Sequence, residues 1–160
     1  MDLTPKRASD SATEMVQVVL PNDTNPLGFI LGGTVMHLID IAGAIACHRH
    51  TRSLLVTAAV DDLQFLNPIK VGDLIILKSH VTCTFTTSLE VQVDVYSEET
   101  LTGKRQQTSR AFLTFVAIAR DGQRVPVTPL VVETDEDRRV WEEAHARRAE
   151  RLRRKVTTSV

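Results

Sequence analysis

The spacing of apolar residues along the chain changes once, from a helical period to a strand-like period. From Gly33 to about Arg49, apolar residues cover every side of a helical wheel, a pattern that is typical of a buried helix. From Leu54 onward, they recur in short runs that are separated by turn residues such as Asn67-Pro68, which predicts successive strands. The expected strands cover 54–66, 74–83, 89–96 and 105–119, and a leading strand covers 14–20.

One long apolar helix next to a run of antiparallel strands predicts an α+β domain. The sheet can bury such a helix by curling around it. Because the other face and the edges of the sheet would stay uncovered, we expect a second copy of the chain to cover them. A length of 160 residues suits a single domain. The expected organisation is a flexible N-terminal tail over 1–13, the domain over 14–133 and a charged C-terminal helix over 134–155.

The C-terminal segment has the charge order of a surface helix. Acidic residues dominate its start and basic residues its end, as the helix dipole favours. Thr134 and Asp137 have the spacing of a capping pair. Its apolar stripe is thin, which indicates a helix that rests on the domain by one edge. Acidic residues offset its arginines and no aromatic stacking surface accompanies them, so nucleic-acid binding is not favoured.

Composition favours a soluble, cytoplasmic protein. Hydrophobic residues make up 42% and charged residues 24% of the chain, and no uninterrupted apolar run is long enough to span a bilayer. The polar first residues lack the apolar stretch of a secretory signal. A formal net charge of -1 provides no general attraction to nucleic acid or to an anionic membrane. Cys47 and Cys83 lie far apart without metal-ligand spacing, so we expect two reduced core thiols and no metal site.

Asp40 places a carboxylate in the middle of the apolar helix. Its neighbours on the helical wheel are His37 and small or apolar residues, so a ligand or another chain can approach it closely. An ionised carboxylate in such a place needs a partner, or its pKa is raised. Two interpretations follow from this residue alone. It forms a structural contact, with His37 or with an arginine from elsewhere, or it is a functional acid.

The residues before the helix contain the parts of an oxyanion site. Asn25 and Gly28 belong to a turn-forming segment, and Gly32-Gly33 opens the helix. Amides in the first helical turn lack intrahelical acceptors, and glycine allows a ligand oxygen to approach them. A tight connection into the helix also explains the glycine pair. Together with Asp40, two turns later, these groups make an oxyanion site and a base.

The pattern formed by Asn25, Gly28, Gly32-Gly33 and Asp40 resembles that of the hotdog-fold acyl-CoA thioesterases. The likeness is closest to the branch of the cytosolic long-chain acyl-CoA hydrolases and their bacterial relatives. It continues through VTAAVDDLQFLNPIKVGD, TSLEVQVDVYSEETLTG and AFLTFVAIARDGQRVPV. The resemblance implies a hotdog fold, in which a curved antiparallel sheet wraps a long central helix, and homodimers or trimers of dimers. It also implies an acyl-CoA substrate with no separate cofactor.

Catalytic roles carry over to three residues. The resemblance implies that Asp40 and Asn25 come from opposite subunits and meet at the subunit interface. Asp40 would be the general base or the nucleophile, and these two routes stay open. Asn25 would orient the water or the carbonyl group. The backbone N–H of Gly33 would bind the developing oxyanion at the positive end of the helix dipole.

Binding of the CoA part of the substrate is expected at further residues. Gly32 lies next to the oxyanion donor, and the resemblance places Thr87 and Ser88 at a CoA contact. Arg105 and Arg110 are candidates for the CoA phosphates on spacing alone. A solvated strand face is the alternative role of these two arginines.

Two other functions are compatible with the same fold. A sensor that binds acyl-CoA without converting it would keep the groove but would not need Asp40. A hotdog enoyl-CoA hydratase would use a histidine with an acid in a differently spaced motif. Because Asp40 and Asn25 are both present, the sequence favours the hydrolase.

Overall fold

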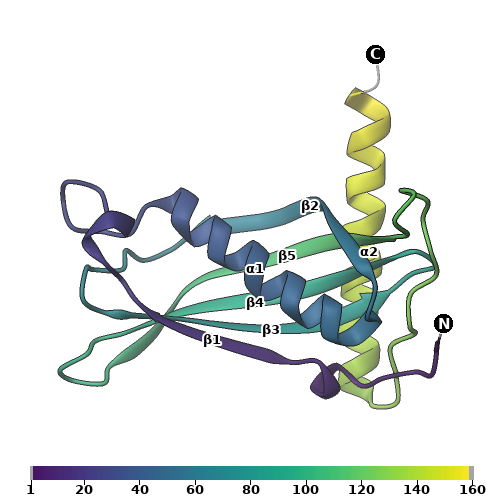
Figure 1. The fold of residues 1–160 in the computed structure, drawn as a ribbon, viewed down its shortest axis with the longest axis horizontal. Coiled ribbons are helices and arrows are strands. Elements are labelled where there is room, and N and C mark those ends of the chain that lie inside the picture. The colour runs from purple at the N-terminus through teal and green to yellow at the C-terminus, as the bar shows by residue number, and fades with distance from the viewer. Residues whose placement is uncertain (1, 159–160) are drawn as a thin grey trace.

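The computed structural model of the chain describes residues 2–158, which form one antiparallel sheet with a helix on each face (Figure 1). The five strands lie in the order β1-β3-β4-β5-β2, so β1 and β2 are the two edges. This order of helix and strands along the chain confirms the expectation from the apolar pattern. The strands are β1 (Thr13–Val18), β2 (Leu54–Phe65), β3 (Leu74–Thr84), β4 (Ser88–Glu98) and β5 (Arg105–Ile118), and the helices are α1 (Gly32–Thr51) and α2 (Asp135–Thr158).

The core lies between α1 and the inner face of the sheet. Alternate residues of β4, from Leu89 to Val95, are 0% exposed and pack in one cluster with α1. Gly43 brings the helix close to the sheet, because a Cβ atom there would lie 3.1 Å from Cγ1 of Val91. Not all of α1 is buried in a single chain, however, since Met36 is 46% exposed. That side of the helix is therefore available to pack against another surface.

The outer face of the sheet is partly covered by α2. The alternation in β4 predicts that Glu90 lies on a wetter face, but its side chain is only 2% exposed. Arg147 of α2 pairs with Glu90 at 2.7 Å, and the hydroxyl group of Thr82 donates to the same carboxylate at 2.6 Å. Ala144 is also buried in this contact. The alternating pattern of β4 thus predicts which side chains are apolar and which are polar. Whether a polar side chain such as Glu90 is buried depends on the packing of α2.

The start of α2 has the expected capping pair. The backbone N–H of Asp137 donates to Oγ1 of Thr134 at 3.0 Å, and the N–H of Thr134 donates to Oδ2 of Asp137 at 3.0 Å. Hydrogen bonds from the N–H groups of Glu133 and Thr134 hold the pKa of Asp137 below its ordinary value. Among the described residues, neither helix is long and apolar enough to cross a membrane.

The N-terminal segment, which the sequence predicts to be a flexible tail, makes hydrogen bonds to the domain at Lys6. The N–H of Lys6 donates to the carbonyl of Pro129 at 3.0 Å, and the N–H of Val131 donates back to Lys6 at 2.9 Å. The ammonium group of Lys6 also donates to the carbonyl of His50 at 2.9 Å. This carbonyl belongs to the last turn of α1, where carbonyl groups lack intrahelical donors and the dipole favours a cation. Lys6 thus links the N-terminal segment to both α1 and the segment before α2.

Both cysteines are buried thiols that form no disulfide with each other. Cys47 lies in α1 and Cys83 in β3. Burial raises the pKa of both thiols, that of Cys83 to about 12. A thiol that stays protonated at neutral pH is a poor nucleophile, so both behave as core residues, as expected.

Candidate active site

Asp40 lies half-buried in the middle of α1, beside the edge strand β2. Its Oδ1 atom accepts a hydrogen bond of 2.7 Å from the hydroxyl group of Thr57 in β2. Asp40 therefore forms a structural contact, as one interpretation of the sequence expected, but its partner is Thr57 where the sequence suggested His37 or an arginine. Within residues 2–158, the other oxygen of Asp40 has no hydrogen-bond partner. One carboxylate oxygen is thus fixed and the other can act on a ligand.

Thr57 is the residue of this group that sequence reasoning missed. It lies in the same alternating row of β2 as Leu55, which packs against the core, and it pairs in register with the buried Phe115 of β5. A threonine in the row that faces α1 is the signal that could have identified it. Its partner could be found only from the packing of the strand against the helix. Thr57 lies in the part of β2 that begins at Leu54, near the C-terminal end of α1.

The N-terminus of α1 offers free amides. Leu31 at the N-cap position makes no side-chain hydrogen bond to the helix, and its carbonyl accepts from the N–H groups of Thr34 and Val35. Among the described residues, the N–H groups of Gly32 and Gly33 are left without an acceptor. Gly33 is exposed, and a Cβ atom built there would meet nothing within 4 Å. At Gly32, a Cβ atom would lie 3.4 Å from the ring of Phe65. A ligand oxygen can therefore approach the exposed first turn of α1.

Asn25 is held in place by its own turn. Its side-chain oxygen accepts hydrogen bonds from the N–H groups of Leu27 at 3.0 Å and Phe29 at 3.2 Å. Gly28 closes the turn with a φ of 82°, a left-handed conformation that favours glycine. As far as the structure describes the chain, the side-chain NH₂ group of Asn25 has no partner. This NH₂ group is thus a fixed donor near the start of α1.

These parts do not form one site within a single chain. Asp40 follows Gly33 by seven residues, which is about 10 Å along a helix axis. The N–H groups of a helix point toward its N-terminus, so an oxygen bound to Gly33 would lie still farther from Asp40. The amides at the start of α1 and the carboxylate in its middle cannot reach the same carbonyl group. A shared site requires two copies of the chain.

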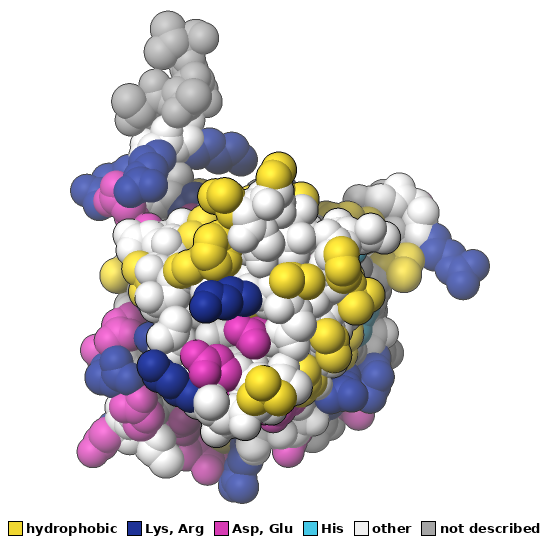
Figure 2. Space-filling model, turned by 90° about the vertical axis from the view of Figure 1, so that its left-hand side faces the viewer, with side chains coloured by type: hydrophobic (Ala, Val, Ile, Leu, Met, Phe, Trp, Pro, Cys, Tyr) yellow, Lys and Arg dark blue, Asp and Glu magenta, His cyan; other side chains and the backbone are white. Residues whose placement is uncertain are grey.

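The edge next to Asp40 is suited to a second copy. β2 pairs with β5 on one side only, and an unpaired edge strand is a template for another strand. Several of its apolar side chains are exposed, among them Leu54 at 51%, Val56 at 45% and Val60 at 42%. Hydrophobic side chains also reach the surface at the end of the molecule that Figure 2 shows. Exposed apolar residues at that end include Leu27, Leu31, Phe65 and Leu66.

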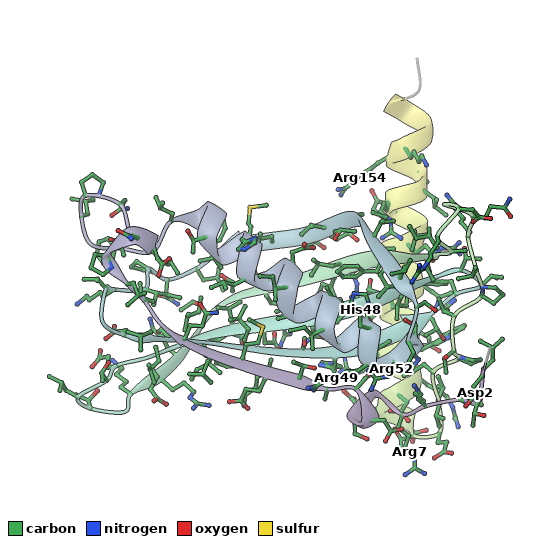
Figure 3. The ribbon with its side chains drawn as sticks, viewed as in Figure 1. Asp2, Arg7, His48, Arg49, Arg52 and Arg154 are labelled. Carbon is green, nitrogen blue, oxygen red and sulfur yellow. The ribbon has the colours of Figure 1, made fainter. Side chains whose placement is uncertain are left out.

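Thr87 and Ser88 lie at the same end of the sheet as Thr57. Ser88 pairs with Val116 of β5, and Val116 pairs with Val56 of β2, the residue before Thr57. The carbonyl of Thr87 accepts a hydrogen bond from β5 at 2.9 Å. Basic side chains gather near this end, around the C-terminus of α1 (Figure 3). They include His48, Arg49 and Arg52.

The two arginines that were candidates for the CoA phosphates are not brought to Asp40. Arg105 pairs with Glu98 at 3.0 Å, where β5 begins, at the opposite end of the sheet from Thr87. Arg110 pairs with Asp94 at 2.5 Å, and this hydrogen bond raises the pKa of Arg110. Each arginine pairs with an acid on the neighbouring strand and stays partly exposed, at 42% for Arg105 and 51% for Arg110. Their structural role is the alternative that the sequence left open.

Comparison with known proteins assigns this chain to a family. The pattern of the thioesterase superfamily matches residues 27–104. A Bacillus subtilis protein named uncharacterized acyl-CoA thioester hydrolase YkhA is 42% identical over 137 residues, which cover 86% of this chain and 80% of that protein. The chain belongs to the acyl-CoA thioester hydrolases of the thioesterase superfamily. The human cytosolic acyl coenzyme A thioester hydrolase is 32% identical over 145 residues, but the chain spans only 38% of its length.

Solved structures of the family share the fold. An apo-hexameric acyl-CoA thioesterase superposes with a TM-score of 0.89 at 39% identity, covering 95% of this chain and 97% of that chain. An acyl-CoA hydrolase from Staphylococcus aureus, in complex with butyryl coenzyme A, coenzyme A and coenzyme A disulfide, superposes with a TM-score of 0.87 at 31% identity, covering 96% of this chain and 93% of that chain. The expected hotdog fold is thereby confirmed.

Three residues that were replaced in variants of the S. aureus hydrolase have the same sequence spacing as three residues of the candidate site. In three structures, alanine replaces an aspartate, an asparagine or a threonine. In that protein the asparagine precedes the aspartate by fifteen residues, and the threonine follows the aspartate by seventeen. Asn25, Asp40 and Thr57 have the same spacing in this chain.

Proposed function

We propose that the protein hydrolyses acyl-CoA to a free fatty acid and CoA, at sites that two subunits share. The observation that carries this proposal is the position of Asp40, which is held by Thr57 beside an unpaired apolar edge. The helix amides that suit an oxyanion point away from it. A copy paired through β2 would bring the start of one α1 to the middle of the other. The names of the relatives support the substrate class.

The proposed reaction uses three groups of the chain. The thioester carbonyl accepts a hydrogen bond from the N–H of Gly33, where the helix dipole stabilises the oxyanion. Asp40 of the other subunit takes a proton from water while the water oxygen attacks the carbonyl carbon, or attacks that carbon itself to give an anhydride. Asn25 orients the water or the carbonyl through its NH₂ group. In the first route the C–S bond then breaks and the CoA thiolate receives the proton from Asp40. In the second route the C–S bond breaks as the anhydride forms, and water then hydrolyses the anhydride, which releases the fatty acid, restores Asp40 and supplies the proton for the thiolate.

Binding of CoA is assigned to the end of the sheet that carries Thr57. Thr87 and Ser88 would contact the CoA chain from the turn between β3 and β4. The basic group around the C-terminus of α1, which includes Arg52, supplies positive charge for the phosphates. Gly32 would border the reacting carbonyl. We assign no CoA contact to Arg105 or Arg110, because each already pairs with an acid.

The oligomer and the location belong to the same proposal. Pairing through β2 gives a homodimer with two equivalent sites. The hexameric thioesterase that superposes on this chain supports a trimer of such dimers. We propose a cytoplasmic protein that needs no cofactor beyond its CoA substrate.

Release of free thiol is the experiment that tests the function. Purified protein is incubated with acyl-CoAs from acetyl to palmitoyl, and the thiol is measured with a chromogenic disulfide. The proposal expects thiol release from at least one chain length, and binding without release would identify an acyl-CoA sensor instead. Loss of the enoyl absorbance from crotonyl-CoA without thiol release would identify a hydratase.

The hydrogen bond from Thr57 gives a further prediction. Thr57→Val removes the hydroxyl group that holds Asp40 at 2.7 Å but keeps the shape of the side chain. Hydrogen bonds to charged groups contribute about 1.5–3 kcal/mol, so we expect kcat to fall about tenfold to a hundredfold. Thr57→Ser, which keeps the hydroxyl group, should retain most of the activity. Equal kcat values for Thr57→Val and the unchanged protein would remove Thr57 from the site.

A further inference from the structure

A cavity of about 420 Å³ lies behind the N-terminus of α1. Its walls come from the Asn25 turn, the first residues of α1, the end of β2 with the loop after it, and β5. Among the described residues that line it, none carries a charged side chain. The apolar side chains around it are Phe29, Ile30, Val35, Phe65, Leu66 and Ile69.

Most of the polar side-chain groups in the cavity wall are bound to the protein itself, and among the described residues the exceptions are the NH₂ group of Asn25 and the hydroxyl group of Ser109. The hydroxyl group of Thr108, which is 1% exposed, donates to the carbonyl of Val95 at 3.2 Å. The amide of Asn67 donates to the carbonyl of Gln107 at 3.2 Å. The side-chain oxygen of Asn25 accepts hydrogen bonds from its own turn. A preformed hollow of this kind favours an alkyl chain over a polar ligand.

The cavity adjoins the place where the reacting carbonyl is proposed to bind. Asn25 and Gly32 both line it, and Gly33 is the next residue of α1. A Cβ atom at Gly32 would lie 3.4 Å from Cζ of Phe65. The lack of a side chain at Gly32 therefore keeps open the space between the helix start and the ring. An acyl chain whose carbonyl oxygen is bound at Gly33 has this space directly beside it.

We propose that this cavity holds the far part of the acyl chain and that Phe65 sets the chain length the enzyme accepts. This inference depends on the proposed hydrolase function. Phe65 is the last residue of β2 and is 52% exposed, so it stands at the wall of the cavity outside the core cluster. Val35 and Ile69 are 3% and 2% exposed and form the buried floor. The ring of Phe65 can therefore change without disturbing the core.

The test is the dependence of kcat/KM on chain length. Phe65→Ala enlarges the cavity, and we expect the ratio of kcat/KM for palmitoyl-CoA to that for butyryl-CoA to rise about tenfold, since a few methylene groups in an apolar pocket change specificity by that much or more. Phe65→Trp should lower the ratio. Val16→Ala is the control, because Val16 is 51% exposed, lies in β1 at the opposite edge of the sheet and does not line the cavity. Its ratio should stay unchanged.

Two outcomes would overturn the inference. The first is an unchanged ratio in both Phe65 variants, and the second is an equal fall of kcat/KM for all chain lengths. Binding of acyl-CoAs to a catalytically blocked Asp40→Ala protein, with and without Phe65→Ala, measures the same preference without turnover. Failure of the proposed function looks different, because the unchanged protein would then release thiol from no acyl-CoA.

Discussion

Asp40→Asn is expected to lower kcat/KM for acyl-CoA hydrolysis by about a thousandfold, the range for loss of a general base or nucleophile. The amide can still accept the hydrogen bond from Thr57, which Asp40 now receives at 2.7 Å, so the local packing should survive. It can neither take a proton from water nor attack the carbonyl. Rates of thiol release at saturating and limiting substrate would separate kcat from KM. The main loss should be in kcat.

Asp62→Asn is the matched control for this change. Asp62 is an exposed aspartate of the neighbouring strand β2, and asparagine tolerates its left-handed backbone, with a φ of 54°. This variant should keep nearly full activity. Gel filtration should show the same oligomer for both variants and for the unchanged protein. Near-normal turnover by Asp40→Asn would show that another group does the chemistry.

Val60→Lys is expected to give monomers that do not hydrolyse acyl-CoA. Val60 lies in the unpaired edge strand β2 and is 42% exposed. A charged side chain in the edge strand of each copy opposes strand pairing. A monomer would keep Asp40 and Gly33, but they are about 10 Å apart along α1 and face different ways. Light scattering after gel filtration, together with thiol release, measures both effects.

Val16→Lys controls for the added charge. Val16 is 51% exposed and lies in β1, the opposite edge of the same sheet. We expect this variant to keep the subunit pair and its activity. An active Val60→Lys monomer would contradict the shared site, and an unchanged dimer would show that the subunits pair elsewhere.

The order of the elements was predictable because it depends on local period. Apolar residues at a helical spacing gave α1, and short runs between turn residues gave the strands. The turn at Asn25 and the open start of α1 at Gly32-Gly33 were also predictable from the local sequence. Glycine favours the φ of 82° at Gly28, and the glycine pair leaves the helix start without side chains. Asp40 was noticed because a carboxylate is unusual in an apolar helix.

Contacts between distant segments could not be read from the sequence. Thr57 meets Asp40 only because β2 packs beside α1. Glu90 was expected on a wetter face, but α2 returns across the sheet and buries it against Arg147. Arg110 was a candidate for a phosphate, whereas strand register places it beside Asp94. Such pairings depend on the fold as a whole, and local pattern does not contain them.

Coexpression of Asp40→Ala with Asn25→Ala tests most directly whether two subunits build each site. Each variant alone should be inactive. If Asp40 and Asn25 of one site come from different chains, random association leaves about a quarter of the sites complete, and about a quarter of the normal rate should return. This fraction is the same for a dimer and for a hexamer. Activity that stays at the level of the separate variants would contradict the shared site, because both residues would then have to act within one chain.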